Sequence, residues 1–152
     1  MTESLKKTGL LCLTFDGVLY GVELPYVIES VRNVRIASLP FLPEYYCGVC
    51  NRMGSITPVV SLARLCGGEE KPEHGVTVML RCGAYDCGVL TQREPLILEV
   101  DEGMRLKGQG ADVASPHWRI KALYACGERK IWQVDVQKSL ESMVVCRSEQ
   151  EV

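Results

Sequence analysis

The amino-acid sequence predicts an all-β protein with short helices. Its apolar residues occur in runs of about four to eight residues, and glycine-bearing turns separate the runs, as in β-sandwiches and barrels. No segment shows the apolar repeat of a long helix. The 152 residues, of which 47% are hydrophobic and 24% charged, fit one globular domain or two small subdomains that share a core.

The first segments predict a β-hairpin and then a short helix. The apolar stretches 10–15 and 18–24 flank an Asp-Gly pair, which accepts the positive φ of a tight turn. Pro25 suits the first turn of a helix, and the apolar positions of residues 26–31 have helical spacing. We therefore expect a strand, a turn, a second strand and a helix.

A second hairpin is expected after the proline-rich loop 39–43, where the fixed φ of proline disfavours a helix. Its strands are predicted at 45–50 and 55–60, with a turn at 51–54. Ser61 can then cap a short helix that ends at a pair of glycines.

After a polar connecting loop at 69–74, the second half of the chain repeats the pattern of the first half. Each half has a glycine-valine pair in the second strand of its first hairpin, and each ends in a strand that leads into a capped helix. The matched pairs are Gly21-Val22 and Gly88-Val89, and the capping residues are Ser61 and Asp135. Two similar β-barrel-like subdomains are expected, with an irregular excursion over 102–118.

Charge and hydropathy exclude several classes of function. Seventeen basic and nineteen acidic residues give a net charge of −2, and no basic run is long enough to follow a nucleic-acid backbone. The apolar stretches are far shorter than the roughly 20 residues of a membrane-spanning helix. Because the first apolar run lacks a signal-peptide cleavage site, we expect a cytoplasmic protein whose eight cysteines are free thiols.

No motif predicts an enzyme or a cofactor. His74 and His117 both fall in expected loops, and the sequence has no glycine-rich nucleotide motif and no zinc-protease motif. We therefore expect a protein that is not an enzyme.

The cysteines leave one alternative open, a thiol-based zinc-binding or redox module. Cys47 and Cys50 form a CxxC pair, which Cys82 and Cys87 could complete to four thiolates. Residues three apart on a strand point to opposite faces, and a second CxxC is missing. Structural thiols are therefore the favoured interpretation.

A series of motifs points to a known family. The segments YGVELPYVIESV, LPFLPEYYCGVCNRMGSITPVVSLARL and RKIWQVDVQKSL, in this order, resemble the CheW-like family of chemotaxis coupling proteins over about residues 10–142. That family has a Tyr-Gly-Ile/Val step, a Val-x-Glu helix, a proline, a Gly-Val-x-Asn-x-Arg-Gly turn and a Pro-Ile/Val-Val-Asp-Leu junction. The matching residues are Tyr20-Gly21-Val22, Val27, Glu29, Pro43, Gly48-Val49-Cys50-Asn51, Gly54 and Pro58-Val59-Val60-Ser61-Leu62.

Two positions depart from the family pattern. The arginine of the Asn-x-Arg-Gly turn falls on Met53, and Arg52 stands one position earlier. The usual aspartate at the strand-helix junction is Ser61, which also caps helices. Since the family arginine lies near the receptor groove, the first departure implies either an altered receptor partner or a guanidinium supplied by Arg52.

The resemblance implies two packed, five-stranded SH3-like β-barrels in a single CheW-like domain. This domain would span 9–146, with approximate halves at 9–70 and 75–142, and 147–152 would form a flexible tail.

The function implied by the resemblance is non-catalytic. Such a protein links the regulatory domain of a CheA-type histidine kinase to the cytoplasmic helical hairpin of a chemoreceptor, and so is recruited to membrane-associated receptor arrays. The receptor-binding groove would comprise Val27, Glu29, Ser30, Arg52, Met53 and Gly54. The kinase-binding surface would include Arg35, Ile36 and Gly48.

Overall fold

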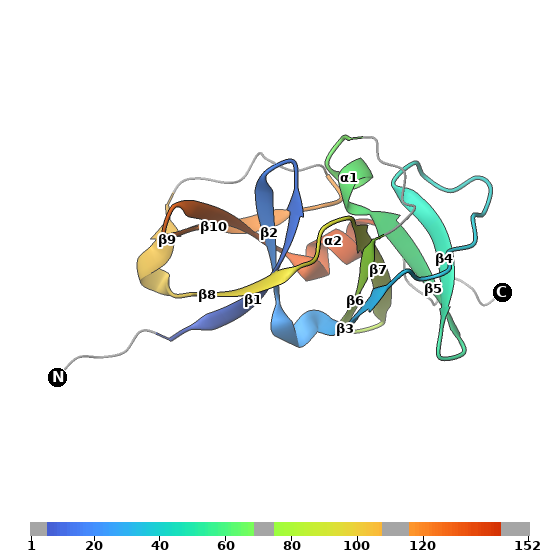
Figure 1. The fold of residues 1–152 in the computed structure, drawn as a ribbon, viewed down its shortest axis with the longest axis horizontal. Helices are drawn as coiled ribbons and strands as arrows, with labels where there is room; N and C mark the ends of the chain where they lie inside the picture. Colours follow the sequence, from blue (N-terminus) through green and yellow to red (C-terminus); the bar gives the residue numbers. More distant parts are fainter. Residues whose placement is uncertain (1–5, 69–74, 108–115, 144–152) are drawn as a thin grey trace.

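Two β-sheets make up the protein (Figure 1). A shared apolar core joins them. The computed structural model describes residues 6–68, 75–107 and 116–143. Within these ranges, the first sheet has six strands, in the order β8 (Leu96–Val100), β1 (Thr8–Phe15), β2 (Val18–Glu23), β11 (Arg129–Val134), β10 (Ile120–Cys126) and β9 (Arg105–Leu106). The second has five, in the order β3 (Val27–Arg32), β6 (Val76–Cys82), β7 (Tyr85–Thr91), β5 (Ser55–Ser61) and β4 (Tyr46–Arg52). The helical segments are the 3₁₀ turns η1 (Leu24–Tyr26) and η2 (Glu102–Met104) and the α-helices α1 (Leu62–Leu65) and α2 (Val136–Ser142).

Each sheet takes strands from both halves of the sequence. In the first sheet, β2 from the first half pairs in parallel with β11 from the second half. In the second sheet, β5 pairs in parallel with β7, and β3 pairs antiparallel with β6. The expected halves 9–70 and 75–142 therefore do not correspond to the two sheets. The short strand β9 also adds a sixth strand to the first sheet, where five were expected.

The repeated glycine-valine pair lies where strands from the two halves meet. Gly21 in β2 is opposite Gln133 in β11, and Gly88 in β7 is opposite Val59 in β5. A Cβ atom at Gly21 would lie 2.9 Å from the Ile131 side chain, and one at Gly88 would lie 3.4 Å from that of Val59. Glycine thus allows the close approach of the parallel strands, and the repeat predicted from the sequence is confirmed at this point.

Buried apolar residues form three clusters. The largest draws side chains from both sheets and both α-helices, and it includes Leu13, Val60, Val89, Trp118 and Leu140. A second cluster belongs to the first sheet and contains Leu10, Cys12, Val100, Ala122, Tyr124 and Ile131. A third belongs to the second sheet and contains Cys50, Val59, Met79 and Leu90. The large shared cluster fixes the two sheets relative to each other.

The helix predicted at 26–31 is wrong, because this segment forms strand β3. Only a 3₁₀ turn around Pro25 precedes it, and the β-branched Val27, Ile28 and Val31 then lie along β6. β-branched side chains favour extended backbone, and pairing with β6 overrides the weak helical spacing. A register shift between Val27 and Glu29 marks a bulge in this strand.

The predicted turns and caps are mostly confirmed. Asp16 and the glycine after it have φ values of 55° and 78°, as a tight hairpin turn requires. The hydroxyl of Ser61 accepts a hydrogen bond from the Arg64 N–H at 3.2 Å, and the carboxylate of Asp135 accepts one from the Lys138 N–H at 3.0 Å. The loop predicted at 69–74 lies outside the described residues, as does the part of the excursion at 108–115.

Candidate functional site

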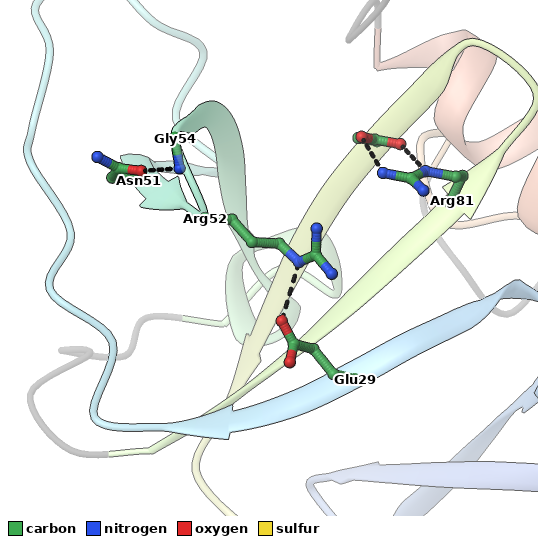
Figure 2. Close-up of polar contacts among 6 residues, drawn as sticks. Glu29, Asn51, Arg52, Gly54 and Arg81 are labelled. Carbon is green, nitrogen blue, oxygen red and sulfur yellow. Dashed lines mark hydrogen bonds and ion pairs between the residues drawn. The ribbon is translucent and has the colours of Figure 1, made fainter.

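An ion pair joins the two segments that were predicted to form the receptor groove. The Arg52 Nε atom donates to the Glu29 Oε2 atom at 2.9 Å, which links the end of β4 to β3 (Figure 2). The side chain of Arg52 is 18% exposed and that of Glu29 is 40% exposed. A half-buried pair of this kind sets the position of both side chains and adds modest stability. Glu29 on β3 is therefore tied to the β4–β5 hairpin.

The β4–β5 hairpin ends in a strained turn. Met53 and Gly54 have φ values of 50° and 89°, so the turn is two residues long and Arg52 stays within β4, although the sequence predicted a turn at 51–54. The Asn51 side-chain oxygen accepts a hydrogen bond from the Gly54 N–H at 2.8 Å (Figure 2). The Met53 side chain is 87% exposed. Its backbone has a positive φ, which residues other than glycine and asparagine rarely adopt.

A second ion pair stabilises the neighbouring hairpin. Arg81 in β6 donates from Nε and Nη2 to the two carboxylate oxygens of Asp86 in β7, at 2.9 Å and 3.1 Å (Figure 2). The hydrogen bonds to the carboxylate raise the pKa of the Arg81 guanidinium above its usual value. Strands β3, β4, β6 and β7 of the second sheet thus carry charged residues that are paired with one another.

The other predicted groove residues lie on β3 beside Glu29. Val27 is half-buried and packs against the large core cluster, whereas Ser30 is exposed. The residues of β3 and of the hairpin tip are therefore joined through the Arg52–Glu29 pair. The six predicted groove residues line neither of two surface hollows, one of about 290 Å³ next to α1 and one of about 210 Å³ next to Arg32 at the end of β3.

The predicted kinase-binding residues lie where the loop after β3 crosses β4. Ala37 and Val49 exchange two backbone hydrogen bonds, of 2.8 and 2.9 Å. Gly48 is buried at a φ of 145°, and a Cβ atom there would lie 2.8 Å from the Ala37 carbonyl carbon and closer still to its oxygen. Ile36 packs partly against the third core cluster, whereas Arg35 is exposed. Gly48 thus leaves room for the loop to cross β4, and Ile36 anchors the loop to the core.

Sequence reasoning did not single out several exposed apolar side chains. Ile56 on β5 is 66% exposed, and Phe41 at the apex of the loop after β3 is fully exposed. Leu39 and Leu42 beside Phe41 are also exposed. The large apolar side chains in the predicted proline-rich loop could have indicated a contact surface, because clustered apolar side chains are uncommon on exposed loops that bind nothing.

The zinc or redox alternative receives no support from the cysteines. In the described part of the chain, no three His, Cys, Asp or Glu side chains are grouped as a metal site would require. Cys50 and Cys87 are buried, and burial raises the pKa of both thiols, that of Cys87 to about 12. Since the thiolate is the form that binds metal and attacks disulfides, these residues are structural.

The helices of the described segments are too short to span a membrane. Over residues 6–68, 75–107 and 116–143, no helix combines the length and hydropathy of a bilayer-spanning segment.

The arrangement of the two sheets is that of a known class of scaffolding proteins. The crystal structure of the scaffolding protein TtCheW from Thermoanaerobacter tengcongensis superposes with a TM-score of 0.75 at 17% sequence identity, and the match covers 86% of this chain and 90% of that one. This similarity establishes the fold. Residues 9–142 match the model of the CheW-like domain, and the chain belongs to this family.

Proposed function

We propose that this chain is a non-catalytic chemotaxis coupling protein that links a CheA-type histidine kinase to chemoreceptors. The observation that carries the proposal is the family match, which extends over residues 9–142 and so includes both sheets and their shared core. The absence of an enzyme motif from the sequence is consistent with an adaptor that acts through surfaces. The protein would work in the cytoplasm, at membrane-associated receptor arrays.

The receptor-binding surface is proposed to lie on β3 and the tip of the β4–β5 hairpin, at Val27, Glu29, Ser30, Arg52, Met53 and Gly54. The Arg52–Glu29 ion pair supports this assignment, because it holds the two segments side by side. Met53 supplies an exposed apolar side chain next to Arg52 in the chain. Such a combination suits the helical hairpin of a receptor, which presents apolar and charged positions at helical spacing.

The kinase-binding surface is proposed to lie at the crossing of the loop and β4, at Arg35, Ile36 and Gly48. Arg35 would contact the regulatory domain of the kinase directly, whereas Ile36 and Gly48 would fix the backbone that presents it. The exposed Ile56 on the neighbouring strand β5 would add apolar area to this contact.

Calorimetric titration of the protein, with its thiols reduced, against the regulatory domain of the CheA-type kinase from the same cell tests the proposal. We expect one-to-one binding with a Kd of about 1 µM or tighter. Ile56→Ser should weaken this binding, whereas Ile97→Ser, at an exposed apolar position of the first sheet, should leave it unchanged. Absence of binding at high concentration would reduce the relationship to a shared fold.

The Met53 departure is tested separately with the receptor hairpin. If Arg52 supplies the guanidinium that the family turn carries one position later, then Arg52→Met abolishes receptor binding and Met53→Arg does not improve it. Receptor binding that appears only in Met53→Arg would instead identify a coupling protein that has lost its receptor. Kinase binding serves as the control for folding in both variants.

A further inference from the structure

The hollow of about 290 Å³ beside α1 has both an apolar wall and charged side chains. Leu62 and Ala63 of α1 are buried, and Phe15 at the end of β1 is half-buried. Asp16 in the β1–β2 turn and Arg93 after β7 also line the hollow, and both residues are exposed to solvent. The β1–β2 turn and α1 both lie along the upper edge of Figure 1. The hollow therefore offers apolar area and one charge of each sign.

A buried hydroxyl without a hydrogen-bond partner borders the same hollow. Thr91, the last residue of β7, lines the hollow and is only 2% exposed. Its Oγ1 atom is buried, and no group in the described part of the chain forms a hydrogen bond with it. Thr91 lies on the same face of β7 as Val89, which belongs with Leu62 of α1 to the large core cluster. The hydroxyl is thus on the side of the sheet where α1 lies. Because buried hydroxyls are normally hydrogen-bonded, a polar group that enters the hollow would supply the missing partner.

The two charged side chains are available to a ligand. Within residues 6–68, 75–107 and 116–143, neither Asp16 nor Arg93 forms an ion pair with another side chain. A guanidinium binds a carboxylate through two parallel N–H donors, and an aspartate accepts hydrogen bonds from an ammonium group. Arg93 and Thr91 are two positions apart and line one hollow, so both can donate to a single carboxylate. Together these groups fit a small molecule that carries a carboxylate and an ammonium group.

We propose that the hollow binds a free α-amino acid with an apolar side chain. Arg93 and Thr91 donate hydrogen bonds to its carboxylate, and the Asp16 carboxylate accepts hydrogen bonds from its ammonium group. The apolar side chain of the ligand lies against Phe15 and Leu62. An apolar cavity of about 150 Å³ holds a benzene molecule, so about 290 Å³ gives room for a branched side chain together with the two charged groups.

This site goes beyond the proposed coupling function, because none of its residues belongs to the proposed receptor-binding or kinase-binding surface. Its volume is close to the lower limit of ligand pockets, about 300 Å³, which favours a molecule as small as a single amino acid over a peptide. The test below needs neither the kinase nor the receptor, so failure of the coupling proposal and failure of this one are distinguishable.

Calorimetric titration of the full chain with L-leucine, with the thiols reduced, tests the proposal. We expect a single site with a Kd between about 10 µM and about 1 mM. Two analogues with the same branched end, isocaproate without the ammonium group and isoamylamine without the carboxylate, should each bind at least about 10-fold more weakly, since each loses a charge-assisted contact. Absence of leucine binding at millimolar concentration, or equal affinity for leucine and either analogue, would overturn the proposal.

Thr91→Val tests the hydroxyl, because it removes the oxygen and nearly keeps the shape of the side chain. We expect leucine to bind about 10-fold more weakly. The melting temperature of the ligand-free protein should not fall, since the exchange removes an unsatisfied buried hydroxyl. Thr77→Val is the matched control, because the Thr77 hydroxyl is also buried and lacks a partner among the described residues, but Thr77 does not line the hollow. Leucine binding should be unchanged in this control. Equal affinities of Thr91→Val and the natural chain would contradict the proposal.

Asp16→Asn and Arg93→Gln test the two charged contacts. Asparagine accepts the φ of 55° at position 16, so the β1–β2 turn is kept. Asp16→Asn should remove the preference for leucine over isocaproate, whereas Arg93→Gln should remove the preference for leucine over isoamylamine. Arg105→Gln on β9 is the matched control and should keep both preferences. Leucine binding that neither Asp16→Asn nor Arg93→Gln weakens would mean that leucine binds elsewhere, and the proposal would be wrong.

Discussion

Replacement of Gly48 by alanine is expected to destabilise the protein and to abolish kinase binding together. Gly48 has a φ of 145°, and a Cβ atom would meet the Ala37 carbonyl group, so the loop could no longer cross β4. The strained φ costs about 1–3 kcal/mol, and each of the two hydrogen bonds between Ala37 and Val49 contributes about 0.5–1.5 kcal/mol. We therefore expect a loss of about 2–6 kcal/mol in the free energy of unfolding.

Urea and thermal unfolding measure this loss, and the melting temperature should fall by roughly 4–24 °C for a chain of this length. Gly83→Ala is the matched control, because Gly83 has a φ of 62° but no atom lies within 4 Å of the place that a Cβ would occupy, so only about 1 kcal/mol is expected. Arg35→Ala should weaken kinase binding without a change in stability. Equal losses in Gly48→Ala and Gly83→Ala would refute the argument that the Ala37 carbonyl sets the cost.

Four further results are expected. A double-mutant cycle of Glu29→Gln and Arg52→Met should give a coupling energy of only about 0.3–1 kcal/mol, since the pair is partly exposed; a value near zero would show that it does not fix β3 against the hairpin. Ser61→Ala should cost about 1 kcal/mol in urea unfolding, whereas Ser61→Asp should preserve stability because it also caps α1. Burial raises the pKa of Cys87 from 9.0 to about 12, so the unfolded state loses this proton first and the free energy of unfolding should fall by up to about 1.4 kcal/mol per pH unit above pH 9. Cys87→Ala should make this decline shallower, and an unchanged slope would contradict the assignment. Met53→Asn should raise stability by up to about 1 kcal/mol, measured by thermal unfolding, because asparagine tolerates a φ of 50°.

The local features of the fold could be predicted from the sequence because short-range chemistry determines them. The Asp-Gly turn after β1 and the side-chain caps at Ser61 and Asp135 depend on residues only a few positions apart. The helix predicted at 26–31 was wrong for the opposite reason, because a distant pairing determines this segment. Its apolar spacing is compatible with a helix, but pairing with β6, some fifty residues later in the chain, makes it a strand.

The pairing within the candidate site could be predicted only in part. The family pattern brought Glu29 and Arg52 into one predicted surface, but the hydrogen bond between residues 23 positions apart depends on the bulge in β3 and on the two-residue turn after Arg52. The hollow at α1 was missed because it combines side chains from three separate segments. No spacing rule in a single sequence reports such a combination.

The exchange of strands between the two halves would let the proposed adaptor hold two partners at a fixed spacing. β3, which carries Glu29, pairs with β6 from the other half, and β5 pairs with β7. Neither half can therefore complete the second sheet alone, and the large cluster around Trp118 and Leu140 ties that sheet to the first. Because the proposed receptor and kinase surfaces both lie on the second sheet, unfolding of either half removes both surfaces at once. An adaptor without chemistry depends on this rigidity, since its contribution is the distance and orientation that it imposes on its partners.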